Sequence, residues 1–220
     1  MNAIKHFVST HRQIWTLCYF PLYLICFYWL EHSTGRSYHI LHSSLDAYIP
    51  FCEYFIIPYL AWFGYVAFGV CYFFFKNKEE YYRLCAFLFT GMTLSLLICT
   101  LFPNGTDLRT AVDPDKNLCS RLVYMLHQAD TNTNVFPSIH VYNSLAIHIG
   151  LVRSKALENN KGLKALSLVT CILICMSTLF LKQHSFIDVL GACVLMTIIY
   201  YFIYSSFSFC NYFSIIVKFF

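Results

Sequence analysis

The chain has 220 residues, of which 58% are hydrophobic and only 12% are charged. Soluble domains have about 25% charged residues, so this composition excludes an ordinary soluble protein and indicates an integral membrane protein. The net charge of +4 does not argue for a nucleic-acid partner, because most of the basic excess lies where membrane proteins carry a cytoplasmic collar of Lys and Arg.

Six apolar segments are candidate membrane helices, since the hydrocarbon core takes about 20 residues per helix. They run over about 14–30, 55–75, 84–102, 137–152, 163–181 and 186–207, and the fourth is short. No small-residue cleavage site follows the first segment, which we interpret as an uncleaved anchor. Without a repeat or linker to divide it, the sequence predicts one all-α domain over residues 1–220, a bundle of six transmembrane helices.

The distribution of Lys and Arg predicts the orientation, because cytoplasmic segments carry an excess of both. With six spans, the two termini and the loops at 76–83 and 153–164 share one side. That side holds Lys5, Arg12, Lys76, Lys78, Arg83, Arg153, Lys155, Lys161, Lys164 and Lys218, against Arg36, Arg109, Lys116, Arg121 and Lys182 on the other. We therefore expect both termini in the cytoplasm, with segments 32–54 and 103–136 and the turn at Lys182 outside.

His184 and Asp188 lie at the outer start of the sixth segment, within LFLKQHSFIDVLGAC (179–193). Residues four apart share one helix face, so the Asp188 carboxylate can hold one ring nitrogen of His184 and leave the other free to attack an electrophile. The alternative is a pair that satisfies itself at the start of a helix. Taken alone, the pair would favour that alternative.

A second polar cluster, NTNVFPSIHVYNS (132–144), opens the fourth segment on the same side of the membrane. Pro137 suits the first position of a helix, whose free N–H groups and positive dipole end attract phosphate. Ser138 adds a hydroxyl donor, and His140 adds a titratable ring. The alternative is a helix cap that meets lipid headgroups. Two histidine-bearing helix ends on one side favour an active site at the outer membrane interface.

Arg109 follows a Pro-Asn-Gly turn in FPNGTDLRT (102–110), and its planar guanidinium is suited to grip phosphate. A solvated loop cation is an equally good interpretation of Arg109 by itself. Together, the three clusters supply cations, a helix start, a histidine pair and an orienting Asp, which fits phosphoryl transfer through a phosphohistidine. No cluster with metal-ligand spacing accompanies them, so we expect no metal and no other cofactor.

Other polar residues are expected to be structural. We interpret the outer residues His32, His39, His42, Asp46 and Glu53 as a wetted polar face. Lys116, Arg121 and His127 are expected at a loop surface, and His148 is expected to be a packed core histidine. Most of the 11 cysteines lie in the spans, where Cys packs as a small apolar residue, and a disulfide between Cys52 and Cys119 stays open.

These clusters resemble the motifs of the phosphatidic acid phosphatase type 2 (PAP2) superfamily of integral-membrane lipid phosphatases and phosphotransferases. The second motif of that superfamily, Pro-Ser-Gly-His, resembles Pro137 to His140, with Ile139 in place of Gly. The third motif, Ser-Arg, five residues, His, three residues and Asp, resembles Ser177 to Asp188.

The chain departs from the superfamily pattern at its phosphate-binding cations. The first motif, a Lys followed seven residues later by Arg-Pro, is matched only at Arg109, because Phe102 and Thr110 hold the other positions. Thr178 stands where the third motif has Arg. Lys182 lies four residues later, and we expect it on the same helix face, where it would replace that Arg. The alternative is an interfacial lysine that snorkels to headgroups.

The resemblance implies a mechanism as well as a fold. His184 attacks phosphorus while Asp188 holds its far nitrogen, and His140 protonates the leaving alcohol and then activates water or another alcohol. Arg109, Lys182 and Ser138 stabilise the phosphate oxygens. The implied substrate is a lipid phosphate with its tail in the bilayer.

The resemblance leaves three functions open. The leading one is a metal-independent lipid phosphate phosphatase. The spacing from His184 to Asp188, with no Arg before it, also resembles the sphingomyelin synthase and inositol phosphoceramide synthase branch, whose members transfer a phosphorylated headgroup to a lipid alcohol. The third is a non-catalytic membrane protein with this fold. The identity of the lipid and the oligomeric state are open.

Overall fold

The computed structural model describes residues 2–33 and 35–205, and within them the chain forms eight α-helices. They are α1 (Asn2–Thr10), α2 (Tyr19–Glu31), α3 (Ile56–Lys76), α4 (Lys78–Leu101), α5 (Leu118–Ala129), α6 (Ile139–Arg153), α7 (Lys161–Phe180) and α8 (Phe186–Tyr200). Strands β1 (His39–Ile40) and β2 (Asn104–Gly105) pair in parallel. Short 3₁₀ or π turns cover Arg12–Cys18, Ser44–Tyr48, Glu53–Phe55, Lys155–Leu157 and Tyr201–Ser205. The predicted all-helical fold is confirmed.

Five of the six predicted spans are helices long and apolar enough to cross a membrane. These helical stretches are Arg12–Glu31, Glu53–Lys76, Lys78–Leu101, Lys161–Phe180 and Phe186–Tyr204. The third begins at Lys78, six residues earlier than predicted, because the Asn77 side chain accepts a hydrogen bond from the Glu80 amide and caps α4 there. The last two residues of the sixth predicted span, 206 and 207, lie outside the described residues.

The fourth predicted span, 137–152, is helical but short. It corresponds to α6, which has 15 residues and measures about 22 Å at about 1.5 Å per residue. The hydrocarbon core is about 30 Å thick. The polar residue Ser138 ends the helix at one side and Ser154 at the other, so neither end is extended by an apolar run.

Helix α6 lies in the middle of the bundle, where it packs against α3, α4, α7 and α8. Its Tyr142 is fully buried and donates a hydrogen bond to the Phe87 carbonyl of α4 at 2.6 Å. The ring lies so close to Gly91 that a Cβ there would stand 1.9 Å from the Tyr142 ring. Gly91 therefore sets the distance between α4 and the helix that begins at Ser138.

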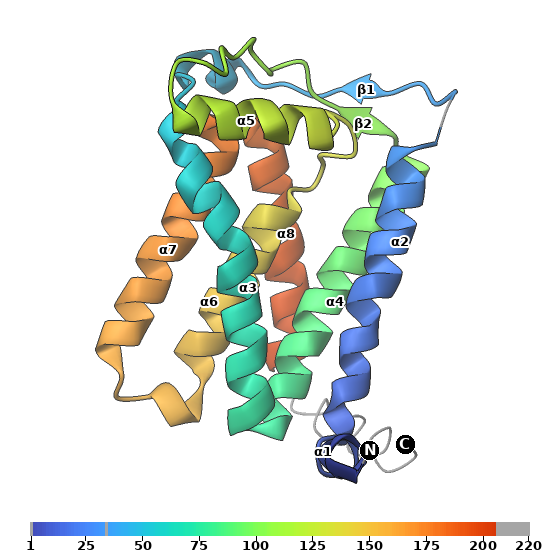
Figure 1. The fold of residues 1–220 in the computed structure, drawn as a ribbon, viewed down its shortest axis with the longest axis vertical. Coiled ribbons are helices and arrows are strands. Elements are labelled where there is room, and N and C mark those ends of the chain that lie inside the picture. Colours follow the sequence, from blue (N-terminus) through green and yellow to red (C-terminus); the bar gives the residue numbers. More distant parts are fainter. Residues whose placement is uncertain (1, 34, 206–220) are drawn as a thin grey trace.

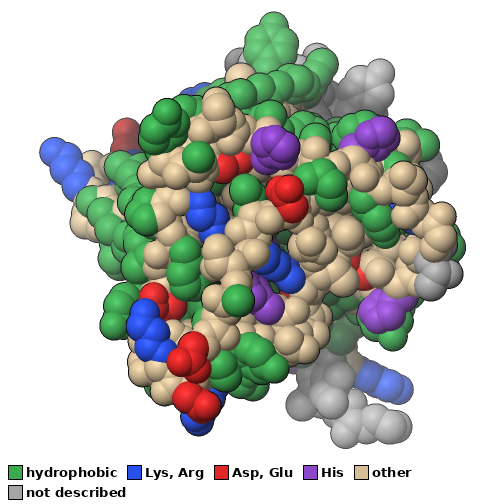
Figure 2. Space-filling model, turned by 90° about the horizontal axis from the view of Figure 1, so that it is seen from above, with side chains coloured by type: hydrophobic (Ala, Val, Ile, Leu, Met, Phe, Trp, Pro, Cys, Tyr) green, Lys and Arg blue, Asp and Glu red, His purple; other side chains and the backbone are tan. Residues whose placement is uncertain are grey.

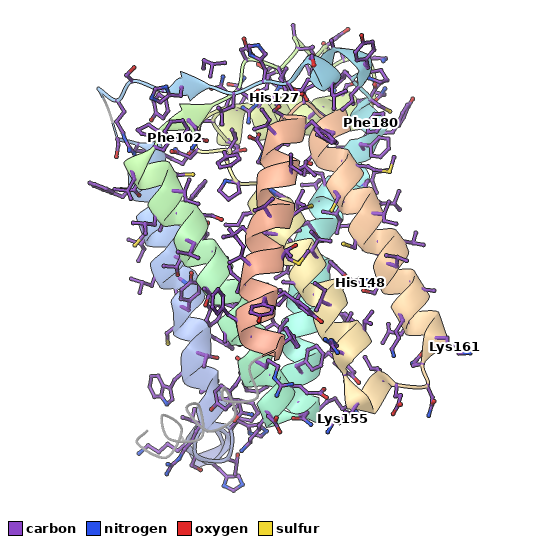
Figure 3. All side chains as sticks on the ribbon, turned by 180° about the vertical axis from the view of Figure 1, so that it is seen from behind. Phe102, His127, His148, Lys155, Lys161 and Phe180 are labelled. Atoms are coloured by element: carbon purple, nitrogen blue, oxygen red, sulfur yellow. The ribbon has the colours of Figure 1, made fainter. Side chains whose placement is uncertain are left out.

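The two ends of the bundle differ in character. In Figure 1, α5, β1 and β2 lie at one end, which we call the α5 end, and α1 lies at the other. In Figure 3, His127, Phe102 and Phe180 lie at the α5 end, while Lys155 and Lys161 lie at the opposite end. The segments that the sequence analysis assigned to one side thus lie at one end. The carboxyl terminus, with Lys218, lies outside the described residues.

The α5 end is covered by a layer of non-spanning chain. Helix α5 crosses the ends of the spanning helices, and segment 35–55 runs beside it (Figure 1). Viewed from above, this face shows Lys, Arg, Asp, Glu and His side chains among polar and apolar atoms (Figure 2). An ion pair of 2.5 Å between Lys116 and the buried Glu53 ties the start of α5 to that segment. The layer closes the bundle over the site described next.

Candidate active site

His184 and Asp188 form a pair at the start of α8, although His184 is outside the helix. Helix α8 begins at Phe186 with Ser185 as its N-cap, so His184 lies on the preceding turn. Its Nδ1 is 3.4 Å from Asp188 Oδ2, and both residues are buried. Neither His184 Nδ1 nor Asp188 Oδ1 has a hydrogen-bond partner among the described residues. The carboxylate therefore faces the imidazole at a distance that a small shift would turn into a hydrogen bond.

The turn that carries His184 is held from both sides. On one side, the amides of Gln183 and His184 donate to the Thr178 carbonyl of α7 at 3.0 and 3.1 Å. On the other side, the Ser185 amide donates to Asp188 Oδ2 at 2.9 Å in a capping box. Because both neighbours of the imidazole are bonded through the backbone, the ring is attached to a fixed support.

The start of α6 lies against the start of α8. The Ser138 amide donates to the Asp188 carbonyl at 3.2 Å, and Ser138 caps α6 by accepting from the Val141 amide at 3.5 Å. The helix begins at Ile139, so the prediction that Pro137 occupies its first position is wrong. Pro137 follows a cis peptide bond and precedes the cap. The contact between the two helix starts brings the second cluster next to the first.

His140 faces His184 across this junction. The two ring centroids are 5.9 Å apart. The His140 ring packs between the rings of Tyr59 and Trp62 of α3, with centroid distances of 4.5 and 4.4 Å. Aromatic contacts on its faces fix the plane of the imidazole. The structure thus brings His140, His184 and Asp188 together, as the sequence analysis expected.

Arg109 lies in a network of acceptors that includes Gln183, the residue directly before His184. Its guanidinium donates to the Asp130 and Thr131 carbonyls at 2.7 and 2.6 Å and to Gln183 Oε1 at 2.7 Å. It also forms an ion pair of 3.3 Å with the Asp130 carboxylate. Burial lowers the pKa of Arg109 and raises that of Asp130, and the attraction between the two charges opposes both shifts. Arg109 Nε is buried and has no hydrogen-bond partner among the described atoms.

Lys182 lies away from this network. Helix α7 ends at Phe180, and Lys182 adopts a left-handed conformation with φ of 57° in the following turn. The expectation that Lys182 shares a helix face with Thr178 is therefore wrong, because the helix stops between them. Its Nζ donates to the Asp46 carbonyl at 2.7 Å. Whether Lys182 binds phosphate stays a prediction.

A small cavity lies between the histidines and α2. Its volume is about 80 Å³, well below the roughly 300 to 1,000 Å³ of sites that enclose a whole ligand. It is lined by Tyr23, Phe27, Leu30, Tyr59, Ser95, Leu96, Cys99, Asp130, Thr131, Thr133, Asn134, Val135, Pro137, Ile139, His140, Gln183 and His184. A space of this size fits a phosphate group and excludes a lipid tail.

Comparison with known proteins agrees with this geometry. Residues 103–212, half of the chain, match the PAP2 superfamily. The chain belongs to the PAP2 superfamily. Neither the curated proteins nor the solved structures contain a match to the chain. The matched segment includes Arg109, Ser138, His140, His184 and Asp188, which are the residues that the motifs assigned to the site.

Sequence reasoning missed two polar residues of this PAP2 site because their partners are distant in the chain. Gln183 is 2% exposed, accepts from Arg109, and its Nε2 lies 2.9 Å from His127 Nε2. The expectation that His127 is loop surface is therefore wrong. Its burial and the charge of Arg109 lower its pKa. The position of Gln183 directly before His184 was the only available signal.

The expectation of a wetted polar face is wrong for two acidic residues of the outer segment. Asp46 is 3% and Glu53 is 6% exposed, whereas His32, His39 and His42 are exposed as expected. The Asp46 carboxylate accepts from Ser185 Oγ at 2.6 Å and from the Phe186 amide at 2.8 Å. Asp46 therefore belongs to the surroundings of the PAP2 site, although it lies outside the matched segment.

Three further expectations concern residues around the PAP2 site. His148 is half-buried, with Nδ1 3.0 Å from Ser167 Oγ, so a packed and bonded histidine is confirmed. Cys52 and Cys119 are both free thiols. No three His, Cys, Asp or Glu side chains of the described residues gather to hold a metal ion.

Proposed function

We propose that the protein is a lipid phosphate phosphatase that works through a phosphohistidine at His184. One observation carries this proposal. His184 lies next to both Asp188 and His140, and the two histidines line a cavity of phosphate size. Membership of the PAP2 superfamily, whose members are lipid phosphatases and phosphotransferases, supports the same chemistry.

In the first step, Nε2 of His184 attacks phosphorus and the bond from phosphorus to the lipid oxygen breaks. Asp188 stabilises the positive charge that develops on the ring by accepting from Nδ1. His140 gives a proton to the leaving oxygen, so that a lipid alcohol departs. Arg109 and the hydroxyl of Ser138 balance the charge on the phosphate oxygens.

In the second step, His140 takes a proton from a water molecule, which attacks the phosphohistidine. The bond between phosphorus and Nε2 breaks, inorganic phosphate leaves, and His184 is neutral again. His140 thus serves as acid and then as base. The two ring centroids are 5.9 Å apart, so the phosphoryl group on His184 would be close to the ring of His140.

The lipid tail is assigned to a groove that continues from the cavity. This groove has a volume of about 940 Å³ and lies between α2, the end of α5 and the loop at 130–132. It shares Phe27, Asp130 and Thr131 with the cavity. Leu24 and Ile25 of α2 line it and are exposed, and the groove also has a polar lining that includes Glu31, Arg109 and Asp130. A tail in this groove would lie in the bilayer while its phosphate reaches His184.

A second candidate function is transfer of a phosphorylated headgroup to a lipid alcohol. The observation that favours it is the state of the two cations that the motifs assign to phosphate, because Arg109 is already paired with Asp130 and Lys182 is bonded elsewhere. A phosphodiester carries one negative charge, whereas a phosphomonoester carries about 1.5 to 2 at neutral pH. One cation suits the diester better.

The test is phosphate release from phosphatidic acid by the purified protein in detergent, with His184→Ala alongside and a lipid alcohol added in parallel. Release that the variant lacks, together with an acid-labile phosphoenzyme, would establish the phosphatase. A new phosphorylated lipid without free phosphate, formed from a phosphodiester donor, would establish the transferase. Activity that persists in His184→Ala would contradict both, and a chain inert toward both donors would indicate the non-catalytic alternative.

A further inference from the structure

We propose that Asp46 is a positioning residue for His184, and that it acts by keeping Asp188 available to the imidazole. This inference rests on the proposed function for the role of His184, and it assigns a part in that role to the outer segment that precedes α3.

Asp46 is 3% exposed, and every contact of its carboxylate is with a backbone amide or a hydroxyl. Oδ2 accepts from the Ser43 amide at 2.7 Å and from Ser185 Oγ at 2.6 Å, and Oδ1 accepts from the Phe186 amide at 2.8 Å. Its carbonyl accepts from Lys182 Nζ at 2.7 Å. Asp46 therefore holds residues 182, 185 and 186, which flank His184 on both sides.

Two carboxylates, those of Asp46 and Asp188, thus accept hydrogen bonds at the start of α8. The free N–H groups and the positive dipole end of α8 attract negative charge. Asp188 Oδ2 accepts a hydrogen bond from the Ser185 amide, while Asp46 accepts from the Phe186 amide and the Ser185 hydroxyl. Asp188 Oδ1 is left without a partner, and Oδ2 stays 3.4 Å from His184 Nδ1.

Removal of the Asp46 charge would change this division. In Asp46→Asn one carboxylate oxygen becomes an NH2 group, so either the Ser185 hydroxyl or the Phe186 amide loses its acceptor, and the Asp188 carboxylate is the nearest anion of the same helix start. Buried donors rarely stay unpaired, so Asp188 would be drawn toward them and away from the imidazole. His184 would then lose the group that fixes its tautomer and stabilises its charge. Asp46 acts through Asp188 and does not touch the reacting atoms.

The test compares Asp46→Asn with Glu53→Gln in the full-length protein, purified in detergent. Glu53 is the matched control because it is also a buried carboxylate of the outer segment, but its hydrogen bond and ion pair within the described structure are with Asn117 and Lys116, at the start of α5. With phosphatidic acid as the probe, we expect Asp46→Asn to lower kcat by about 100-fold, as a displaced catalytic group does. KM should stay within about twofold, because no phosphate contact is removed. Glu53→Gln should keep its kcat.

A double-mutant cycle separates positioning from general destabilisation. If Asp46 acts through Asp188, Asp46→Asn should lower kcat by less than about twofold in an Asp188→Asn background. Independent, multiplicative losses would overturn the proposal, as would a normal kcat in Asp46→Asn. Should that variant fail to fold, Ser185→Ala removes one donor of the same contact, and a normal kcat there would overturn the proposal as well.

A measurement that needs no substrate separates this inference from the proposed function. Diethyl pyrocarbonate modifies neutral imidazole, and its rate at His184 can be followed by mass spectrometry of the peptide. We expect the rate to fall by at least about threefold in both Asp46→Asn and Asp188→Asn, relative to Glu53→Gln, because an oriented ring is the better nucleophile. An unchanged rate would overturn the positioning role. A changed rate in a protein without phosphatase or transferase activity would refute the proposed function alone.

Discussion

Each histidine of the site is held by a different kind of contact. The His184 backbone is bonded to the end of α7 and its ring faces a carboxylate, whereas His140 is sandwiched between Tyr59 and Trp62. A nucleophilic histidine needs an unprotonated ring nitrogen that is held in a fixed orientation. A histidine that acts as general acid and then as general base needs a fixed ring with one nitrogen free of other hydrogen bonds. The contacts match these two needs.

We expect different losses when each histidine is removed. His184→Ala should lower kcat by roughly 10,000-fold or more and abolish the phosphoenzyme. His140→Ala should lower kcat by about 100-fold to 10,000-fold, and phosphohistidine formed from an activated donor should accumulate because water is no longer deprotonated. His148→Ala is the control, since His148 bonds only to Ser167 in the described structure. Equal activity of His140→Ala and His148→Ala would remove His140 from the mechanism.

His127 predicts a loss of stability in acid. Burial and the charge of Arg109 lower its pKa below the ordinary 6.5. At a pH between the two pKa values, His127 is protonated in the unfolded chain and neutral in the folded one. Its contribution to the free energy of unfolding is therefore fully present above about pH 6.5 and is lost as the pH falls below that value. We expect the melting temperature in detergent to fall from about pH 7 to about pH 5.

The substitution His127→Gln isolates this contribution, because glutamine keeps a partner for Gln183 but does not titrate. The fall of the melting temperature with acid should be smaller in this variant. Asp130, whose pKa is raised by burial, contributes with the opposite sign, and it is present in both proteins. An identical fall in both would show that His127 does not carry the acid sensitivity.

At the scale of the elements, the position of α6 depends on its packing against α4. A Cβ at Gly91 would stand 1.9 Å from the Tyr142 ring, whereas one at Gly64 of α3 would meet nothing within 4 Å. We expect Gly91→Ala to destabilise the protein by about 1 to 3 kcal/mol, as overpacking does, and to lower activity because the start of α6 moves. Gly64→Ala should melt as the wild type does. Thermal unfolding followed by circular dichroism compares the two, and equal melting would refute the tight contact.

The elements also show how far sequence reasoning reaches. The long apolar helices and the pairing of His184 with Asp188 were predictable, because both depend on residues close in the chain. The conformation of Lys182 was not, since it is left-handed and no glycine marks that position. The burial of Asp46 was not predictable either, because its partner Ser185 is 139 residues away. What was missed depends on local backbone conformation at Lys182 and on tertiary contacts at Asp46.

At the scale of the whole molecule, the predicted orientation can be tested by lysine labelling. Lys116 is at the α5 end and its side chain is 60% exposed, and Lys161 is exposed at the opposite end. If the cytoplasm contains both termini, a membrane-impermeant amine reagent should modify Lys116 in intact cells and leave Lys161 unmodified. In permeabilised cells, both lysines should be modified. If Lys161 alone were modified in intact cells, the predicted orientation would be wrong and the α5 end would face the cytoplasm.

Residues from the first half of the chain support the site, and this has a consequence for how the sequence can change in evolution. Tyr59 and Asp46 precede the segment that identifies the superfamily, yet one stacks on His140 and the other holds the start of α8. A chimaera that joins residues 103–205 to the first half of a distant relative would inherit the histidines without their supports. Changes in the turn that carries His184 should therefore be accompanied by changes near Asp46, and the two halves should be exchangeable only together.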